Sequence, residues 1–170
     1  MNKTIEIIKN RVSCRSYSDK KVSKAKLEQI VEAGKMAPSA MNRQICNILV
    51  IKSSRLLEKI KEASITCLNR DCMYGAKSLC IVTGKKDEPF VIQDGSCILE
   101  NMFIAAAALK IDSCWINQFN DLLSDERNKK LRKRLGLTDE DRVVGAAIFG
   151  YRKEANIPSK NRKEDFIKYL

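Results

Sequence analysis

The chain has 170 residues, of which 44% are hydrophobic, and 32 basic against 21 acidic side chains give it a formal net charge of +11. A chain of this length buries about 70% of its unfolded surface, so the composition predicts one compact domain over residues 1–170. The longest apolar runs, such as ILVI and FIAAAAL, are far shorter than the ~20 residues of a membrane span, and the N-terminus lacks the apolar stretch of a signal peptide, so we expect a cytoplasmic protein that makes no contact with a membrane.

The positive charge is compatible with an anionic partner, and nucleic acid is the obvious candidate. However, the basic residues alternate with acidic ones along the chain, as in SDERNKKLRKRLGLTDEDR (124–142), and only 6% of the residues are aromatic. Runs of mixed charge are typical of solvated helix faces. We therefore expect no nucleic-acid partner.

The sequence contains no histidine and seven cysteines. The lack of histidine excludes catalytic arrangements of the Ser-His and Cys-His types. The cysteines form no C-x-x-C pair, and their spacing does not resemble that of zinc knuckles. We expect reduced cysteines that pack as small apolar side chains, and no metal site.

Hydrophobic spacing predicts helices interleaved with strands, and residues 65–77 show no clear pattern. The first half is expected to contain, in chain order, a helix capped by Thr4, a helix capped by Ser23 and ended by Pro38, a buried strand over 47–52, an amphipathic helix over 54–64 and a buried strand over 78–84. The second half is expected to contain a central helix over 94–110, a strand over 112–116, a basic helix over 125–136 closed by Gly136, and a buried strand over 142–151. This order predicts an α+β fold with a mixed central β-sheet flanked by helices.

Two segments of the second half have side chains that predict contacts with another part of the chain or with a second copy of it. The alanines at 105–108 remove side-chain bulk from the central helix, so either another part of the chain or a second copy of this helix can approach closely. The polar C-terminal tail ends in apolar residues that need a surface to lie on, in this subunit or in a partner: Phe166, Ile167, Tyr169 and Leu170.

A cluster of hydrogen-bond donors in RVSCRSYS predicts an anion site. Neither a P-loop nor a G-x-G-x-x-G turn occurs, so a bound phosphate would have to be held by side chains. Arg11, Ser13 and Arg15 suit this role, because guanidinium groups bind phosphate oxygens in pairs and the hydroxyl adds a further donor. Lys160 and Arg162 form a second basic pair near the C-terminus. The alternative is that these arginines lie on the surface and pair with Asp19 or Glu6.

The segment RVSCRSYSDKKVSKAKLEQIVEAGKMAPSAMNRQ resembles the opening of the nitroreductase family of FMN-dependent NAD(P)H oxidoreductases, which carries R-x-S-x-R-x-[FY] and then A-P-S-x-x-N-x-Q. The resemblance continues in the same order through YGAKSLCIVTG, DGSCILENMFIAAAALKIDSCWI and LRKRLGLTDEDRVVGAAIFGYRKE. It therefore covers nearly the whole chain, and it implies a nitroreductase-like fold.

The resemblance implies the following site. Arg11, Ser13 and Arg15 match the residues that hold the FMN phosphate and ribityl chain, with Arg15 reaching toward the pyrimidine edge of the flavin. Lys160 and Arg162 match the C-terminal basic pair that closes on the phosphate. The remaining matches are in the loop that reaches the flavin from the other subunit of a homodimer, whose C-terminal tails wrap around the partner: Pro38, Ser39, Ala40 and Asn42.

By the same resemblance, NADH or NADPH reduces FMN in a ping-pong cycle, and a small acceptor such as a nitroaromatic or a quinone reoxidises it. Because the cofactor supplies the chemistry, no catalytic side chain is required beyond Arg15 as an electrostatic aid. The alternative is an FMN-binding protein with little NAD(P)H turnover that serves flavin storage, sensing or modification. The chain departs from the family pattern at Ile45, Lys110, Asn117 and Arg152, and the sequence leaves open whether Cys114 approaches the flavin or packs in the core.

Overall fold

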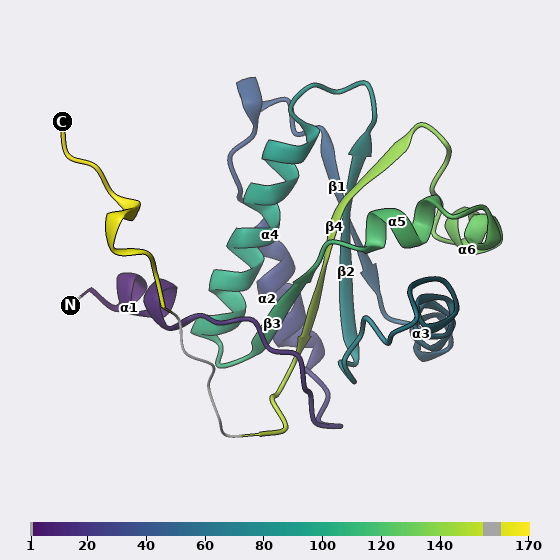
Figure 1. Ribbon diagram of the computed structural model, residues 1–170, viewed down its shortest axis with the longest axis horizontal. Coiled ribbons are helices and arrows are strands. Elements are labelled where there is room, and N and C mark those ends of the chain that lie inside the picture. Colours follow the sequence, from purple (N-terminus) through teal and green to yellow (C-terminus); the bar gives the residue numbers. More distant parts are fainter. Residues whose placement is uncertain (1, 155–160) are drawn as a thin grey trace.

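A four-stranded sheet with helices on both faces forms the centre of the molecule (Figure 1). The computed structural model describes residues 2–154 and 161–170. The strands lie in the order β1-β2-β4-β3, and each neighbouring pair is antiparallel. They are β1 (Cys46–Ile51), β2 (Ser78–Lys85), β3 (Asp112–Ile116) and β4 (Asp141–Gly150).

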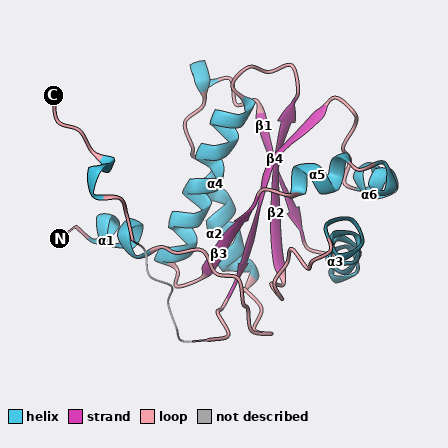
Figure 2. Cartoon of the chain, viewed as in Figure 1, coloured by secondary structure: helices cyan, strands magenta, loops and turns pink. Residues whose placement is uncertain are grey.

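Helices cover both faces of this sheet (Figure 2). Over the described residues the α-helices are α1 (Lys3–Asn10), α2 (Lys24–Lys35), α3 (Ser54–Leu68), α4 (Val91–Ala108), α5 (Phe119–Ser124) and α6 (Lys129–Arg134). Short 3-10 helices occur at η1 (Ala40–Asn42), η2 (Glu126–Asn128) and η3 (Glu164–Phe166). Helices α2 and α4 lie on one face, α3, α5 and α6 lie on the other, and α1 lies outside α4 (Figure 1).

Alternate residues of β2 enter two separate apolar cores. Leu79 and Ile81 pack on the side of α3 and α5, whereas Cys80 and Val82 pack on the side of α4, and all four are fully buried. Successive side chains of a strand point to opposite faces, so a central strand covered on both sides must be apolar at nearly every position. This explains why SLCIVTG reads as an uninterrupted apolar run.

The α+β class expected from the sequence is confirmed, but the strand directions differ from the expected mixed sheet. The four strands are antiparallel throughout, and the parallel pairing among the described residues is the isolated bridge between Ser13 and Ser113. The apolar pattern of a strand shows which residues are buried and carries no information on strand direction. The intervening helices are long enough to permit either direction.

The expected basic helix over 125–136 is wrong in its first part. Asp125 has an extended backbone (ψ 128°), and its side chain caps η2 by accepting the Arg127 N–H at 2.9 Å, so the helix is interrupted before α6 begins at Lys129. Helix α5 was not expected, because its six residues are too few to show a helical period. Its apolar residues Phe119, Leu122 and Leu123 are nevertheless fully buried.

Helices α4 and α6 end in the same backbone arrangement, with different residues at the left-handed position. After α4, Lys110 has φ +57°, the Lys110 N–H donates to Ala107 O at 3.1 Å, and the Ile111 N–H donates to Ala106 O at 2.8 Å. After α6, Gly136 has φ +75° and is held by the equivalent pair of bonds. This motif favours glycine, so Lys110 strains the end of the central helix.

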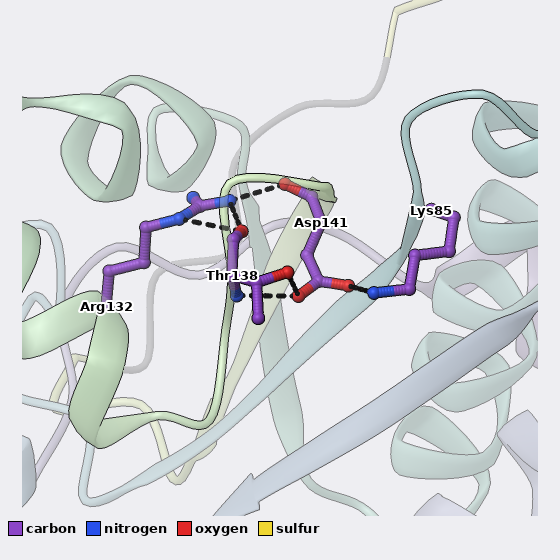
Figure 3. Close-up of polar contacts among 4 residues, drawn as sticks. All are labelled: Lys85, Arg132, Thr138 and Asp141. Atoms are coloured by element: carbon purple, nitrogen blue, oxygen red, sulfur yellow. Dashed lines mark hydrogen bonds and ion pairs between the residues drawn. The ribbon is translucent and has the colours of Figure 1, made fainter.

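A polar cluster joins α6, β2 and β4 at one end of the sheet (Figure 3). The buried Arg132 guanidinium donates to Thr138 O (Nε–O 3.1 Å) and to Asp141 O. The Asp141 carboxylate accepts from Lys85 Nζ at 2.7 Å and from the Thr138 N–H at 2.7 Å. Partial burial alone would raise the pKa of Asp141, but the hydrogen bonds from Lys85 and Thr138 lower it to about 2.

We expect Lys110→Gly to stabilise the fold by about 0.5–1 kcal/mol. An L-residue in the left-handed region costs about 1–2 kcal/mol, and the larger unfolded-state entropy of glycine offsets part of the gain. The measurement is the midpoint of urea unfolding at an unchanged slope. The matched variant Gly136→Ala should be destabilising, because a β-carbon there meets no atom within 4 Å and adds only backbone strain. A neutral or stabilising Gly136→Ala would contradict this account.

We expect Asp141 to make stability depend on acidic pH. Its folded-state pKa of about 2 lies below the ordinary value of ~3.9, so its contribution is complete above about pH 5 and is lost as the pH falls toward 2. The contribution is on the order of 1 kcal/mol, because the Lys85 side chain is 55% exposed and solvent weakens the pair. Asp141→Asn should reduce the change of the unfolding free energy with pH between pH 5 and 2. Asp139→Asn, at an exposed neighbouring position, should leave that pH dependence as it is in the wild type. Equal slopes in the two variants would rule out Asp141 as the source.

Candidate functional site

Residues 11–17 form an extended segment beside β3. Helix α1 ends at Asn10, and Arg11 is already extended (φ −62°, ψ 128°). Ser13 forms a parallel bridge with Ser113, and the Cys14 N–H donates to Ser113 O at 2.9 Å. An extended backbone places residues 11, 13 and 15 on one side and alternate residues on the other. The three expected anion-binding residues therefore share one side of a fixed segment.

Burial does not follow a strict alternation to the end of the segment, because Cys14 and Tyr17, three positions apart, are both buried. Arg11 and Ser13 are half-buried, and Arg15 is exposed. The Arg11 side chain is 20% exposed, and its Nε lies 3.9 Å from Glu100 Oε1 of α4. This distance is too long for a hydrogen bond, so the pair does not lock the guanidinium. Among the described residues Asp19 makes no ion pair with these arginines, and its Oδ1 lies 3.5 Å from Lys77 Nζ.

The segment borders a cavity of about 490 Å³ between α1, β3 and the C-terminal end of α4. Its lining includes four basic residues, Lys3, Arg11, Lys110 and Arg152, and two acidic ones, Glu6 and Asp112. The excess of positive charge around the cavity favours an anionic occupant. This is the part of the described structure where Arg11 could meet a ligand.

Arg152 fixes the far end of the segment. Its N–H donates to Asp112 Oδ2 at 3.0 Å, its Nε donates to Asp112 Oδ1 at 2.9 Å, and its backbone bridges Tyr17. The hydrogen bond to Asp112 raises the pKa of Arg152. Asp112 holds the Arg152 guanidinium, and the Arg152 backbone bridges Tyr17. Arg152 therefore ties the segment to the ends of β3 and β4. Sequence reasoning marked Arg152 only as a departure from the family pattern and did not find its partner.

Cys114 packs in the core. Its side chain is 2% exposed, and its Sγ lies 3.5 Å from Trp115 O. Burial raises the pKa of the Cys114 thiol, and the nearby Arg15 guanidinium and the Ser13 hydroxyl oppose that shift. The side chain is therefore a protonated thiol at neutral pH and a poor nucleophile.

The loop after α2 contains the second group of expected residues. Helix α2 ends at Lys35, and the following turn is held by the Ala40 N–H, which donates to Asp94 Oδ1 of α4 at 3.0 Å. The Ser39 hydroxyl accepts the Gln44 N–H at 3.1 Å. Met41, Asn42 and Gln44 have φ angles of +52°, +53° and +52°. Left-handed backbone at three non-glycine residues stores strain, which is typical of functional loops.

This loop and the arginine segment border different cavities. A cavity of about 310 Å³ is lined by Pro38 and Ser39 at the N-terminal end of α4, and no arginine lines it. Figure 1 shows the loop beyond one end of α4 and residues 11–17 near the other end. The structure of one chain therefore does not bring the two expected groups together around one ligand.

The C-terminal basic pair is described only in part. Arg162 is exposed, and Lys160 lies outside the described residues. The apolar side chains of the tail that follows are largely exposed: Phe166 is 77% exposed and Tyr169 is 91% exposed.

Two further departures have simple local roles. Ile45 packs against the core on the side of α4, and the carbonyl of Asn117 accepts the Asn120 N–H at 3.3 Å at the start of α5. Within residues 2–154 and 161–170, no three potential metal ligands gather, and no helix is both long enough and apolar enough to cross a membrane.

Comparisons with known proteins agree on one family. The sequence profile of the nitroreductase family matches residues 8–71 and 64–151. A protein of Archaeoglobus fulgidus with the provisional name NADH dehydrogenase/NAD(P)H nitroreductase is 31% identical over 156 residues, which are 91% of this chain and 88% of the relative.

Solved structures show the same fold. A nitroreductase with bound FMN from Bacteroides fragilis superimposes with a TM-score of 0.93 at 29% identity, over 100% of both chains. A nitroreductase with bound FMN from Desulfitobacterium hafniense gives a TM-score of 0.89 at 24% identity, over 100% of this chain and 99% of that one. The match to the family profile across most of the sequence, together with the full-length relative, shows that this chain belongs to the nitroreductase family.

Proposed function

We propose that this protein is an FMN-dependent oxidoreductase that takes electrons from NADH or NADPH and passes them, in a ping-pong cycle, to a small acceptor such as a nitroaromatic or a quinone. The observation that carries the proposal is the fixed extended segment 11–15, whose first residue, Arg11, lines a cavity with more basic than acidic residues. It is supported by the similarity over 100% of both chains to a nitroreductase with bound FMN, and over 91% of this chain to a relative whose provisional name assigns NAD(P)H nitroreductase activity. Bound FMN supplies the chemistry, because its ring takes up a hydride and releases electrons to an acceptor.

The residues of the segment fit the anionic end of such a cofactor. Arg11 is half-buried and is held near Glu100 only by a long contact, so its charge is sheltered from water and free to turn toward a phosphate. Ser13 lies on the same side of the segment and adds a neutral donor. Lys160 and Arg162 are the further donors of this proposal, supplied by the C-terminal part of the chain.

Arg15 has a different role in the proposal. It is the exposed member of the series, and its positive charge acts on the same side as Ser13 and the Cys114 thiol. A guanidinium at the pyrimidine edge of a flavin would stabilise the negative charge that the ring acquires on reduction. Arg15 would thus favour electron uptake without transferring a proton itself.

The complete site is proposed to form between two copies of the chain. Pro38 and Ser39 line a cavity that no arginine among the described residues lines, and Ala40 and Asn42 follow them in the same loop. These four residues would act on the flavin of a partner subunit. The exposed apolar residues of the tail and of α1 offer a surface for the partner, since Phe166 is 77% exposed and Ile5 is 48% exposed. A closed two-fold dimer would bury both surfaces at once.

The cofactor proposal is tested by flavin retention and by its reduction. The wild-type protein is expected to retain FMN after desalting and to lose its visible absorbance when NADH or NADPH is added without oxygen. Charge-assisted hydrogen bonds contribute about 1.5–3 kcal/mol each, so Arg11→Ala combined with Arg15→Ala should weaken FMN binding by roughly 100-fold or more. Arg55→Ala removes an exposed arginine of α3 and should leave the affinity unchanged.

The other possible results of the flavin experiment would favour a different function or exclude the proposed site. Flavin that is retained and is not reduced by either nucleotide would favour a flavin-binding protein for storage, sensing or modification. If no FMN is retained, or if the double arginine variant binds as tightly as wild type, the proposed site is wrong.

The two-subunit site is tested by shortening the tail. Removing residues 164–170 deletes the exposed apolar residues of the C-terminus, and we expect it to raise the dimer dissociation constant at least 10-fold, as measured by sedimentation equilibrium. FMN affinity should fall with it, because the loop contacts come from the partner. Lys168→Ala keeps the apolar residues and is the control. A truncated chain that remains dimeric with full FMN affinity would exclude the tail from the interface.

A further inference from the structure

A cavity of about 430 Å³ lies at the edge of the sheet, where the edge strand β1 ends and β2 begins. This volume is within the range of small-molecule sites. Helices α2 and α3, which lie on opposite faces of the sheet, both contribute to its wall (Figure 1). The described residues that line the cavity include none of 11–15 or 38–42, so the inference does not depend on the proposed flavin site.

The charged side chains around this cavity are mainly basic. Five lysines and one glutamate line it: Lys21, Lys24, Lys52, Lys61, Lys77 and Glu58. Glu58 lies 3.3 Å from Lys61 Nζ and offsets one of these charges. Lys24 and Lys77 pair with exposed acids outside the cavity, and solvent weakens such pairs. Among the described residues Lys21 and Lys52 make no ion pair, so the cavity keeps an excess of positive charge that favours an anionic ligand.

Apolar side chains form another part of the wall. Leu27 of α2, Ile51 of β1 and Leu57 of α3 line the cavity, and Ile51 is only 7% exposed. Leu27 packs on the core on the side of α4, whereas Ile51 and Leu57 belong to the core on the side of α3. The cavity therefore lies where the two cores meet at the sheet edge. A flat ring would displace water from this apolar surface.

The kind of basic residue indicates which anion fits. The described lining contains lysines and no arginine, so the anion meets separate point charges in place of a planar fork. The lysines come from separate segments, with Lys21 before α2, Lys52 after β1 and Lys77 before β2. A phosphate monoester carries about two negative charges at pH 7 and has three acceptor oxygens that point in different directions. A carboxylate has one charge and two oxygens in a single plane, so it satisfies fewer of these donors.

The start of α3 adds to the same charge. Ser54, the first of the 15 residues of α3, lines the cavity, and Ser53 caps the helix by accepting the Leu56 N–H at 3.3 Å. The N-terminal end of a helix carries a partial positive charge that stabilises phosphate groups. This end of α3 therefore supports the lysines.

We propose that this cavity binds a phosphate monoester of a flat apolar ring, with the ring on Leu27, Ile51 and Leu57 and the phosphate beside Lys21, Lys52 and Lys77. The site is separate from the arginine segment, so the chain would hold this ligand with or without a flavin. The ring supplies affinity by leaving water, and the phosphate fixes its orientation.

The test uses 1-naphthyl phosphate as the probe and the full-length protein. Chemical-shift changes of backbone amides are followed during titration, and we expect them at Val22, Ile51 and Ala76. Three matched probes each lack one feature: 1-naphthol has no phosphate, inorganic phosphate has no ring, and 1-naphthoate has a single charge. Each should bind at least about 10-fold more weakly, because charge-assisted bonds or ring burial are lost.

The decisive variant combines Lys21→Ala with Lys52→Ala. Both side chains are exposed and make no ion pair among the described residues, so the fold should be kept and affinity for 1-naphthyl phosphate should fall at least about 10-fold. Lys59→Ala combined with Lys133→Ala removes the same charge at exposed positions outside the cavity and should leave the affinity unchanged.

A further variant separates this site from the flavin site. Arg11→Ala combined with Arg15→Ala should bind 1-naphthyl phosphate as tightly as wild type. A loss of binding in that variant would assign the probe to the arginine segment and overturn the proposal.

Three other results would also overturn it. The first is an absence of 1-naphthyl phosphate binding. The second is equal binding of 1-naphthyl phosphate and inorganic phosphate or 1-naphthol. The third is an equal affinity of the two lysine pairs of variants, which would mean that the probe responds only to the net charge of the chain.

Discussion

Backbone pairing between residues 13–18 and the sheet is the constraint on which the candidate site depends. The segment is bonded on both sides, with the Cys14 N–H donating to Ser113 O at 2.9 Å and the Ser18 N–H donating to Tyr151 O at 2.8 Å. An arginine on a mobile chain would lose conformational entropy each time it bound an anion. On this segment the backbone part of that cost has already been met during folding, so the side chains at 11, 13 and 15 keep a common side.

The pairing in turn depends on a contact between the two ends of neighbouring strands. Asp112 begins β3, and Arg152 follows β4 by two residues. The carboxylate of Asp112 accepts both the backbone N–H and the guanidinium of Arg152, and Arg152 bridges Tyr17. A proline at position 152 would lack this N–H, so the backbone bond to Asp112 requires a residue other than proline there.

Helix α4 connects the two halves of the candidate site. Asp94 near its start holds the loop through Ala40, and Glu100 lies near Arg11. These two residues are six positions apart, which is about 9 Å along the helix axis. The helix can keep this position because Gly95 faces Val144 of β4, where a β-carbon would lie 2.7 Å from Val144 Cγ2. The packing of α4 on the sheet therefore also fixes the distance between the loop held by Asp94 and the arginine segment near Glu100.

Much of this architecture could be predicted from local patterns. The buried strands could be recognised from their apolar runs, and Ser23 caps α2 as expected, accepting the Lys26 N–H at 3.4 Å. Arg11, Ser13 and Arg15 could be grouped because an extended backbone needs only a spacing of two. These features depend on neighbours in sequence, so they are visible in the sequence.

The rest depends on contacts between distant residues. Asp112 and Arg152 are separated by 40 positions, and neither has a local signal that identifies its partner. Asp94 resembles any acidic residue in the first turn of a helix, where negative charge is common, so its bond to the loop could not be predicted. The antiparallel direction of the strands likewise follows from how the helices return the chain, which the burial pattern does not encode.

Three buried or partly buried thiols of this chain have raised pKa values. Burial raises the pKa of the Cys46 thiol to about 11 and that of the Cys80 thiol to about 12, and it also raises the pKa of Cys114. The chain has no histidine, so no imidazole changes its charge beside the segment between pH 6 and 8. A phosphate ligand has a second pKa of about 6, so its own ionisation would change its binding near that pH.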